Sequence, residues 1–180
     1  MRTFVAVEIT NEAILDEIKK IQNELKIRAK PVNVKNMHFT LEFLGEITES
    51  MSDDVQKALK SIVFEPFTLS FRGIGAFPKP KFPRVVWIGT DDLGGGKLKE
   101  LASKVEDSLT PLGFKSDKPF KPHVTIFRIK SKIGDITKDL KRFENVELGS
   151  QQVTKIKFKK SILTPDGPVY SDLLEVVATK

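Results

Sequence analysis

The stretches His38-Phe39-Thr40-Leu41 and His123-Val124-Thr125-Ile126 contain the only two histidines of this 180-residue chain, and both read His, apolar, Thr, apolar. Because side chains alternate between the two faces of a β-strand, His and Thr two residues apart share one face while the apolar residues occupy the other. Each stretch therefore predicts a half-buried strand that presents one imidazole and one hydroxyl. Two such strands facing each other would surround one small anion with two proton-transfer groups and two hydrogen-bond donors.

A structural interpretation competes with this one. A single histidine on a half-buried strand is commonly a residue satisfied by hydrogen bonds, and threonine in a strand follows from the β preference of branched side chains. The repetition of the whole phrase favours a shared function over coincidence. We therefore take His38, Thr40, His123 and Thr125 as candidate site residues.

Composition limits the possible chemistry. Hydrophobic residues make up 39% of the chain and charged residues 30%, which is typical of a folded protein. The absence of cysteine excludes disulfides, thiolate catalysis and cysteine-ligated zinc. Neither histidine has a second ligand four residues on along a helix, so we expect no metal site and no cofactor.

Charge and hydropathy suggest a partner and a location. The formal net charge of +6 suggests an anionic partner, although many basic proteins are merely soluble. The opening stretch is too short for a signal peptide, and no run approaches the ~18 apolar residues of a membrane helix. We expect a cytoplasmic protein that does not engage a membrane.

Periodicity predicts the same order of elements twice. The first half reads as a strand over Thr3–Glu8, a helix that starts at Thr10 or Asn11, the His38 strand and a helix that starts at Ser50 or Ser52. Strands are then predicted over Phe67–Arg72 and Arg84–Gly89, joined by a turn-rich connection over residues 73–80.

The second half follows the same sequence of elements. The glycine-rich stretch at residues 91–96 reads as a break, and a helix is predicted over Lys97–Leu109 before the His123 strand. A short helix around Asp135–Phe143 and strands over Gln152–Lys160 and Val169–Val177 complete the prediction. We interpret the chain as one two-lobed domain over residues 1–180, with halves at roughly 1–90 and 91–180 related by a pseudo-twofold axis.

Further stretches of the chain resemble the two-histidine phosphoesterase superfamily, specifically its RNA 2′,3′-cyclic phosphodiesterase group, also called the 2′-5′ RNA ligase family. In the first half these stretches are Phe4, the His38 motif, the Phe43-Leu44-Gly45 that follows the motif, residues 75–78 and residues 83–89. In the second half they are residues 112–114, residues 118–126 with Arg128, and residues 161–170. The resemblance covers nearly the whole chain.

The resemblance implies an α+β, bilobal fold in which two antiparallel sheets face a central cleft, the helices lie outside, and strand exchange between the halves is allowed. It also implies that Arg128 helps to hold a phosphate. In an unbroken strand Arg128 would share a face with Val124 and Ile126, away from His123, so a bulge or the strand's end is needed to turn it. The alternative is a surface arginine.

The implied reaction is the opening of a ribose 2′,3′-cyclic phosphate by water without a metal. One imidazole removes the proton of water and the other protonates the departing ribose oxygen, each step being worth roughly 10²–10⁴-fold. The resemblance assigns His123 as proton acceptor, His38 as proton donor and a 2′-phosphomonoester as product. The residues alone leave the two roles interchangeable. Thr40 and Thr125 would bind the non-bridging oxygens.

Two further groups of residues could contact RNA. Phe77, Phe82 or Trp87 could stack on a base, with core packing as the alternative for Trp87. Lys155, Lys157 and Lys159 alternate with apolar residues. They could follow an RNA backbone, or they could protect an exposed edge strand from pairing with another chain.

Three functions remain in competition. The first is hydrolysis of RNA 2′,3′-cyclic phosphate ends, with tRNA fragments as one candidate substrate and a monomer as the expected state. The second is 2′-5′ RNA ligation by the reverse chemistry, expected to be minor because water at ~55 M competes with the second RNA end. The third is a non-catalytic RNA-end binding module, against which the paired histidines and threonines argue.

Overall fold

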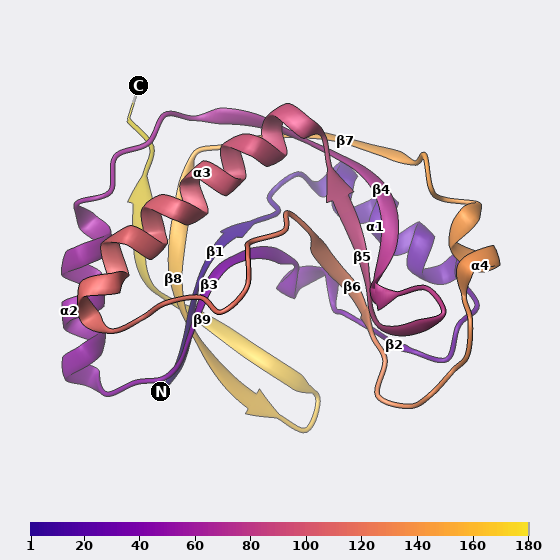
Figure 1. Cartoon of the computed structure of the whole chain (residues 1–180), viewed down its shortest axis with the longest axis horizontal. Coiled ribbons are helices and arrows are strands. Elements are labelled where there is room, and N and C mark those ends of the chain that lie inside the picture. Colours follow the sequence, from indigo (N-terminus) through magenta and orange to yellow (C-terminus); the bar gives the residue numbers. More distant parts are fainter. Residues whose placement is uncertain (180) are drawn as a thin grey trace.

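The computed structural model describes residues 1–179, which form two antiparallel β-sheets with helices packed against them (Figure 1). The strands are β1 (Arg2–Glu8), β2 (Lys30–Pro31), β3 (His38–Glu46), β4 (Phe67–Lys79), β5 (Phe82–Thr90), β6 (Val124–Arg128), β7 (Glu147–Val153), β8 (Lys155–Thr164) and β9 (Gly167–Val177). The α-helices are α1 (Glu12–Glu24), α2 (Glu49–Lys60), α3 (Asp92–Leu109) and α4 (Thr137–Lys141). Two 3₁₀ turns, η1 (Val34–Asn36) and η2 (Thr110–Leu112), complete the described elements.

The predicted α+β class with two antiparallel sheets is confirmed. One sheet has the order β3-β1-β8-β9 and is called sheet A below; the other, sheet B, has the order β2-β6-β5-β4-β7. The His38 strand therefore lies at one edge of sheet A, and the strand that follows His123 lies inside sheet B. Each sheet contains strands from both halves of the chain, because β8 pairs with β1, and β6 and β7 pair with β5 and β4.

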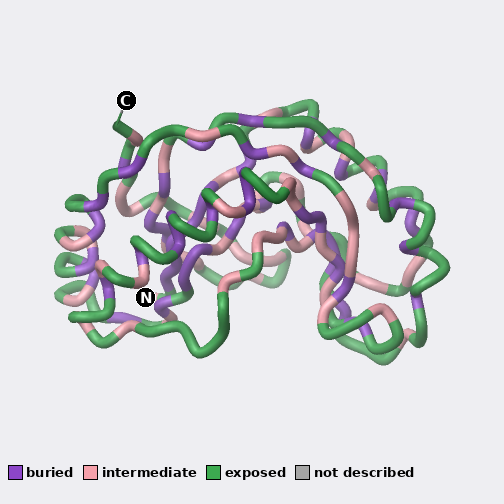
Figure 2. The backbone as a smooth tube through the Cα atoms, turned by 45° about the horizontal axis from the view of Figure 1, so that its top comes forward, coloured by how far each residue is buried: buried purple, intermediate pink, exposed green. Residues whose placement is uncertain are grey.

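The helices lie against one face of each sheet. Helix α3 contacts β3 of sheet A and β4 of sheet B, α2 contacts α3, and α1 contacts β6 and β7. The contacting faces are apolar: Phe39, Leu59, Leu69, Leu98 and Ile126 are among the largest fully buried side chains. In Figure 2 the buried positions follow the strands and the inner sides of the helices. No helix within residues 1–179 is long and apolar enough to cross a bilayer.

Local sequence signals explain the helix starts. The Asn11 side chain accepts a hydrogen bond from the Ala13 amide at 2.9 Å and caps α1, and the Thr48 hydroxyl accepts from the Met51 amide at 3.1 Å and caps α2. Helix α2 therefore starts at Glu49, ahead of the predicted Ser50 or Ser52.

Two glycine-rich segments were predicted wrongly. Residues 92–96 form the first turn of α3, because the Asp91 carboxylate accepts from the Gly94 amide at 2.9 Å and caps a helix that begins at Asp92, five residues before Lys97. A Cβ at Gly94 would crowd the carbonyl oxygen of Thr68, so this glycine allows α3 to approach β4 closely. Residues 73–79, predicted as a turn-rich connection, continue β4 past an irregularity at Gly73, where φ is +78°.

A third correction concerns the predicted strand Gln152–Lys160. Its first residues belong to β7 of sheet B and the rest to β8 of sheet A, with the break at Thr154. A continuous β-type pattern does not reveal that a chain changes sheets. The short strand β2 was not predicted, and the helix predicted over Asp135–Phe143 shrinks to Thr137–Lys141.

Candidate active site

Both histidine motifs have the same local structure. From His38 to Phe43 the residues run half-buried, buried, half-buried, buried, buried, exposed, and His123 to Arg128 repeat this order position for position. The apolar residues next to each histidine, Phe39 and Val124, are completely buried. The predicted alternation therefore holds over the first residues of each motif.

A β-bulge follows the threonine in each motif. In β3, Thr40 pairs with Ala6 and Glu42 with Val5, so Leu41 is the additional residue. In β6, Thr125 pairs with Trp87 and Phe127 with Val86, so Ile126 is the additional residue. A bulge of this kind reverses the alternation of faces beyond it.

The bulge in β6 places Arg128 on the same face of sheet B as Thr125. Arg128 pairs with Val85, which is two residues from Trp87 and shares its face. The sequence alone could not decide whether Arg128 turns toward the histidine, and the register supplies the answer. By the same argument the bulge in β3 places Phe43 on the face of Thr40, in the position that corresponds to Arg128.

The two imidazole rings are held by the same contact. Nδ1 of His38 lies 2.7 Å from the carbonyl oxygen of Asn36, and Nδ1 of His123 lies 2.6 Å from that of Lys121. A carbonyl only accepts, so Nδ1 carries the proton in each ring. A neutral ring therefore has its lone pair on Nε2, the atom available for proton transfer.

The surroundings of Nε2 differ between the two rings. Nε2 of His38 lies 2.9 Å from the Thr40 hydroxyl, which donates to it when the ring is neutral. Within residues 1–179, neither Nε2 of His123 nor the Thr125 hydroxyl makes a hydrogen bond to the protein.

Aromatic side chains fix both rings from the side. Phe4 stacks on His38 with the ring centroids 4.9 Å apart, and Tyr170 meets the same ring edge to face at 5.5 Å. Phe77 meets His123 edge to face at 5.0 Å and contacts Trp87 at 5.3 Å. The Asn36 side chain also donates to the carbonyl of Pro168 at 3.1 Å, which ties the start of the His38 strand to the β8–β9 hairpin.

Electrostatics connect the two motifs. The pKa of His38 is lowered to about 4, mainly by burial and also by the charges of Lys159 and Arg128, while the hydrogen bond to Asn36 opposes the shift. Burial also lowers the pKa of His123, with added contributions from Arg128 and Lys121. The Arg128 guanidinium therefore acts on both imidazoles, and β3 and β6 are in contact although they belong to different sheets.

The edge-strand hypothesis for the β8 lysines is wrong, and the hypothesis of an RNA contact is wrong for Lys157 and Lys159, whereas Lys155 is half-buried and pairs with Glu175. Strand β8 lies between β1 and β9, so it is not an edge strand that needs protection. Lys159 is only 6% exposed and lies 2.9 Å from both Glu8 and Asp172, while Lys157 pairs with the same two carboxylates. Because their charge is neutralised within the sheet, Lys157 and Lys159 do not form a free basic track for RNA.

Sequence reasoning gave no role to two residues of the site. Phe43 is 68% exposed and its ring centroid lies 6.3 Å from that of Phe4, so an apolar ring stands on the histidine face of sheet A. Tyr170 pairs with Ser161 of β8, and this pairing places the Tyr170 ring on the same face of sheet A as His38. Only the strand register reveals both placements. Within residues 1–179, no group of three or more potential metal-ligand side chains converges.

Comparison with known proteins identifies relatives over the whole length of the chain. The family model described as LigT like phosphoesterase matches twice, at residues 7–87 and 88–170, once for each half. An RNA 2′,3′-cyclic phosphodiesterase of Archaeoglobus fulgidus is 41% identical over 175 residues, covering 96% of this chain and 98% of the relative.

Two solved structures share the fold. The chain aligns with a Thermus thermophilus protein at a TM-score of 0.80 and 30% identity, covering 98% of this chain and 97% of the other. Escherichia coli LigT complexed with 3′-AMP aligns at a TM-score of 0.80 and 25% identity, covering 99% and 98%.

Proposed function

The chain belongs to the LigT-like phosphoesterase family, and from this premise we propose that it hydrolyses 2′,3′-cyclic phosphate ends of RNA to 2′-phosphomonoesters. The observation that carries the proposal is the pair of imidazoles, one from each half. Each has Nδ1 held by a backbone carbonyl and Nε2 left for proton transfer, and Arg128 acts on both. The Archaeoglobus fulgidus relative, which carries the name of this activity, supports the choice of substrate.

His123 is the proposed base. Its Nε2 has no partner within residues 1–179, and the lowered pKa keeps the ring neutral at pH 7, as removal of a proton from water requires. The water attacks phosphorus in line with the 3′ oxygen, the new P–O bond forms, and the bond to the 3′ oxygen breaks. The phosphate remains on the 2′ oxygen.

His38 is the proposed acid, which delivers a proton from Nε2 to the departing 3′ oxygen. Burial, Lys159 and Arg128 keep the pKa of its ring near 4 in the free protein. To act as the acid, His38 therefore needs its pKa to rise when the substrate binds. The negative phosphate supplies that change, because an anion beside an imidazolium favours its protonated form. Thr40 and Thr125 donate to the non-bridging oxygens, and Arg128 balances the charge that develops there.

Phe43 is the proposed stacking platform for the terminal base. Its exposed ring shares the face of His38 and Thr40 beyond the bulge, and bases at single-stranded RNA ends stack on such rings. Phe77 packs against His123 and Trp87, which makes it better suited to positioning the imidazole.

The proposed chemistry is independent of metal, because two imidazoles, two hydroxyls and a guanidinium supply every proton transfer and charge contact it needs. Reversal of the same steps, with a 5′ hydroxyl in place of water, gives a minor 2′-5′ ligation. The proposed substrate class includes tRNA fragments with cyclic phosphate ends, and the proposed state is a monomer.

The test is an assay of an oligoribonucleotide that ends in a 2′,3′-cyclic phosphate, with wild type, His38→Ala and His123→Ala. We expect wild type to open the cyclic end and each variant to lose at least a hundredfold in kcat. Fluorescence anisotropy of the labelled RNA measures binding in parallel. A wild type that binds the RNA without opening the ring would replace this proposal with the non-catalytic binding module.

A further inference from the structure

An open pocket lies beside the end of β6, outside the site described above. It has a volume of about 650 Å³ and is formed by two segments, residues 81–84 at the start of β5 and residues 132–135 in the loop after β6. The Ile129 amide donates to the carbonyl of Arg84 at 2.9 Å, so the wall formed by residues 81–84 is joined to the residue that follows Arg128. The pocket is therefore adjacent to the strand that carries Thr125 and Arg128.

The pocket carries an excess of positive charge. Lys81, Arg84 and Lys132 line it together with one carboxylate, that of Asp135. Asp135 already accepts hydrogen bonds from the amide and the hydroxyl of Thr137 at the start of α4. Throughout residues 1–179, no carboxylate lies within 4.0 Å of the charged nitrogens of the three cations. They differ in this from Lys157 and Lys159, whose charges are paired inside sheet A.

An aromatic ring lies among these charges. Phe82 lines the pocket and is 58% exposed, and the Lys79 ammonium lies 5.4 Å from its ring centroid. A cationic surface that also offers an exposed aromatic ring suits single-stranded nucleic acid, because cations attract the phosphates and a base stacks on the ring. A small inorganic anion would use only the cations.

Arg128 connects the pocket to the catalytic residues. Three residues of β-strand separate Thr125 from Arg128, about 10 Å at ~3.3 Å per residue, and Arg84 is adjacent in sequence to Val85, the partner of Arg128 in β5. Lys30 adds a second cation on the same face of sheet B, on the side of β6 that is away from β5. An RNA strand whose end is at Thr125 can therefore reach the pocket along Arg128.

We propose that this pocket binds the nucleotides on the 5′ side of the cyclic phosphate end. The enzyme then acts on the end of an RNA strand in preference to a cyclic mononucleotide. This inference rests on the proposed function, because it places the body of the same substrate whose terminal phosphate lies between the histidines.

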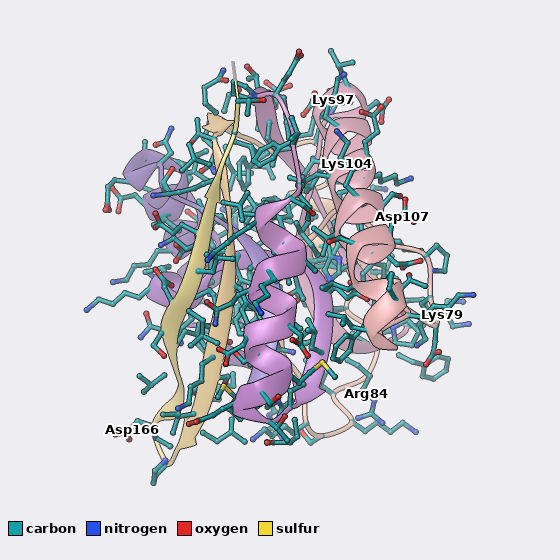
Figure 3. All side chains as sticks on the ribbon, turned by 90° about the vertical axis from the view of Figure 1, so that its left-hand side faces the viewer. Lys79, Arg84, Lys97, Lys104, Asp107 and Asp166 are labelled. Atoms are coloured by element: carbon teal, nitrogen blue, oxygen red, sulfur yellow. The ribbon has the colours of Figure 1, made fainter. Side chains whose placement is uncertain are left out.

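The test compares kcat/KM for cytidine 2′,3′-cyclic phosphate with that for a five-nucleotide RNA ending in the same group. In the double variant Arg84→Ala/Lys132→Ala, we expect kcat/KM for the RNA to fall tenfold or more and that for the mononucleotide to change less than twofold. We expect Phe82→Ala also to lower kcat/KM for the RNA and not for the mononucleotide, but by a smaller factor. The matched control is Lys97→Ala/Lys104→Ala on α3, which removes the same charge; Figure 3 shows Lys97 and Lys104 above Arg84, toward the opposite end of the molecule.

An equal loss for both substrates, or no loss for either, overturns the proposal, as does a wild type without preference for the RNA. A wild type inactive on both substrates contradicts the proposed function instead. In that case, titration with an unreactive RNA that ends in a 3′ hydroxyl tests whether the pocket binds RNA, independently of catalysis. Binding weakened by Arg84→Ala/Lys132→Ala, with a flatter dependence on salt, supports the site, and unchanged binding overturns it.

Discussion

His38 and His123 make the same contact through Nδ1 but differ in what surrounds Nε2. The His38 ring lies between Phe4 and Tyr170 and already contacts Thr40, whereas His123 has no hydrogen-bond partner at Nε2 within residues 1–179. Their equivalent positions explain why the sequence could not distinguish acid from base. The difference between them comes from the orientation of the Thr40 hydroxyl and from Phe4 on β1 and Tyr170 on β9, which are far from His38 in the sequence.

The buried His38 makes the folded protein sensitive to acid. Its pKa is about 4 in the folded state and about 6.5 in an unfolded chain, so the unfolded state takes up the proton first as pH falls below neutrality. The resulting loss of stability at pH 5, relative to pH 7.5, is about 2 kcal/mol. We expect His38→Gln to reduce the acid-induced loss by roughly this amount in urea unfolding at the two pH values. An unchanged loss would contradict the lowered pKa.

Glu42 should show the opposite pH dependence. Both of its carboxylate oxygens are buried without a hydrogen-bond partner among residues 1–179, and burial together with the charge of Glu106 on α3 raises its pKa to about 7. The folded state therefore holds this proton better than the unfolded chain, and stability is lost as pH rises from about 4.5 through 7. Thermal unfolding at pH 8 should find Glu42→Gln more stable than wild type by about 1–2 kcal/mol, with a smaller difference at pH 5. A variant that is less stable at both pH values would contradict this.

At the scale of elements, the two bulges determine which side chains reach the site. The motif predicted the face of His and Thr correctly, because alternation holds over three residues. It could not place Phe43 or Arg128, because the additional residues Leu41 and Ile126 resemble any other apolar strand residue. Only pairing with β1 and β5 shows where the alternation reverses.

The errors in the predicted elements have a similar cause. Glycine at residues 73, 75 and 94–96 suggested turns, yet these residues lie within β4 and α3, where Gly75 and Gly94 allow close approach of a neighbour. Gly75 pairs with Trp87 and lies beneath its ring, and Gly94 lies against β4. Composition alone does not separate a glycine that ends an element from a glycine that leaves room for a neighbour. The elements with clear caps and periodicity, such as α1, were predicted correctly.

Gly75→Ala tests this interpretation of β4. A Cβ at this position would overlap the Trp87 ring, which is the neighbour of Thr125 in the adjacent strand. We expect a loss of about 1–3 kcal/mol in stability, a shift in the fluorescence of the only tryptophan, and reduced activity. Gly96→Ala is the control, because no atom of the described residues 1–179 lies within 4 Å of a Cβ there and alanine favours the helix. If Gly75→Ala matched Gly96→Ala in fluorescence and stability, the account of β4 would be wrong.

At the scale of the whole molecule, neither half of the chain contains a complete sheet. Sheet A needs β8 next to β1 and β9 next to β8, and β6 of sheet B pairs with β5 from the first half. The family model nevertheless matches each half separately. The repeated order of elements was visible in the sequence, but the exchange of strands was not, because a pattern of elements does not specify which strands pair.

This arrangement predicts that the halves fold only together. A fragment of residues 1–90 keeps β3 beside β1 and β4 beside β5 but lacks β8 and β6, so the backbone groups on one side of β1 and of β5 are left unpaired. We expect it to show no cooperative thermal transition by circular dichroism. Fragments 1–90 and 91–180 mixed after denaturation should regain the transition if they assemble. A cooperative transition in the isolated first fragment would contradict the inference that each half needs strands of the other half in order to fold.

The most direct measurement is identification of the terminal phosphate formed when the protein acts on an RNA 2′,3′-cyclic phosphate end in the presence of EDTA. Wild type, His38→Ala and His123→Ala are compared under the same conditions. The account predicts a 2′-phosphate from wild type despite the chelator and essentially none from either variant. Loss of wild-type activity in EDTA, a 3′-phosphate product, or full activity in either variant would contradict catalysis by the two histidines.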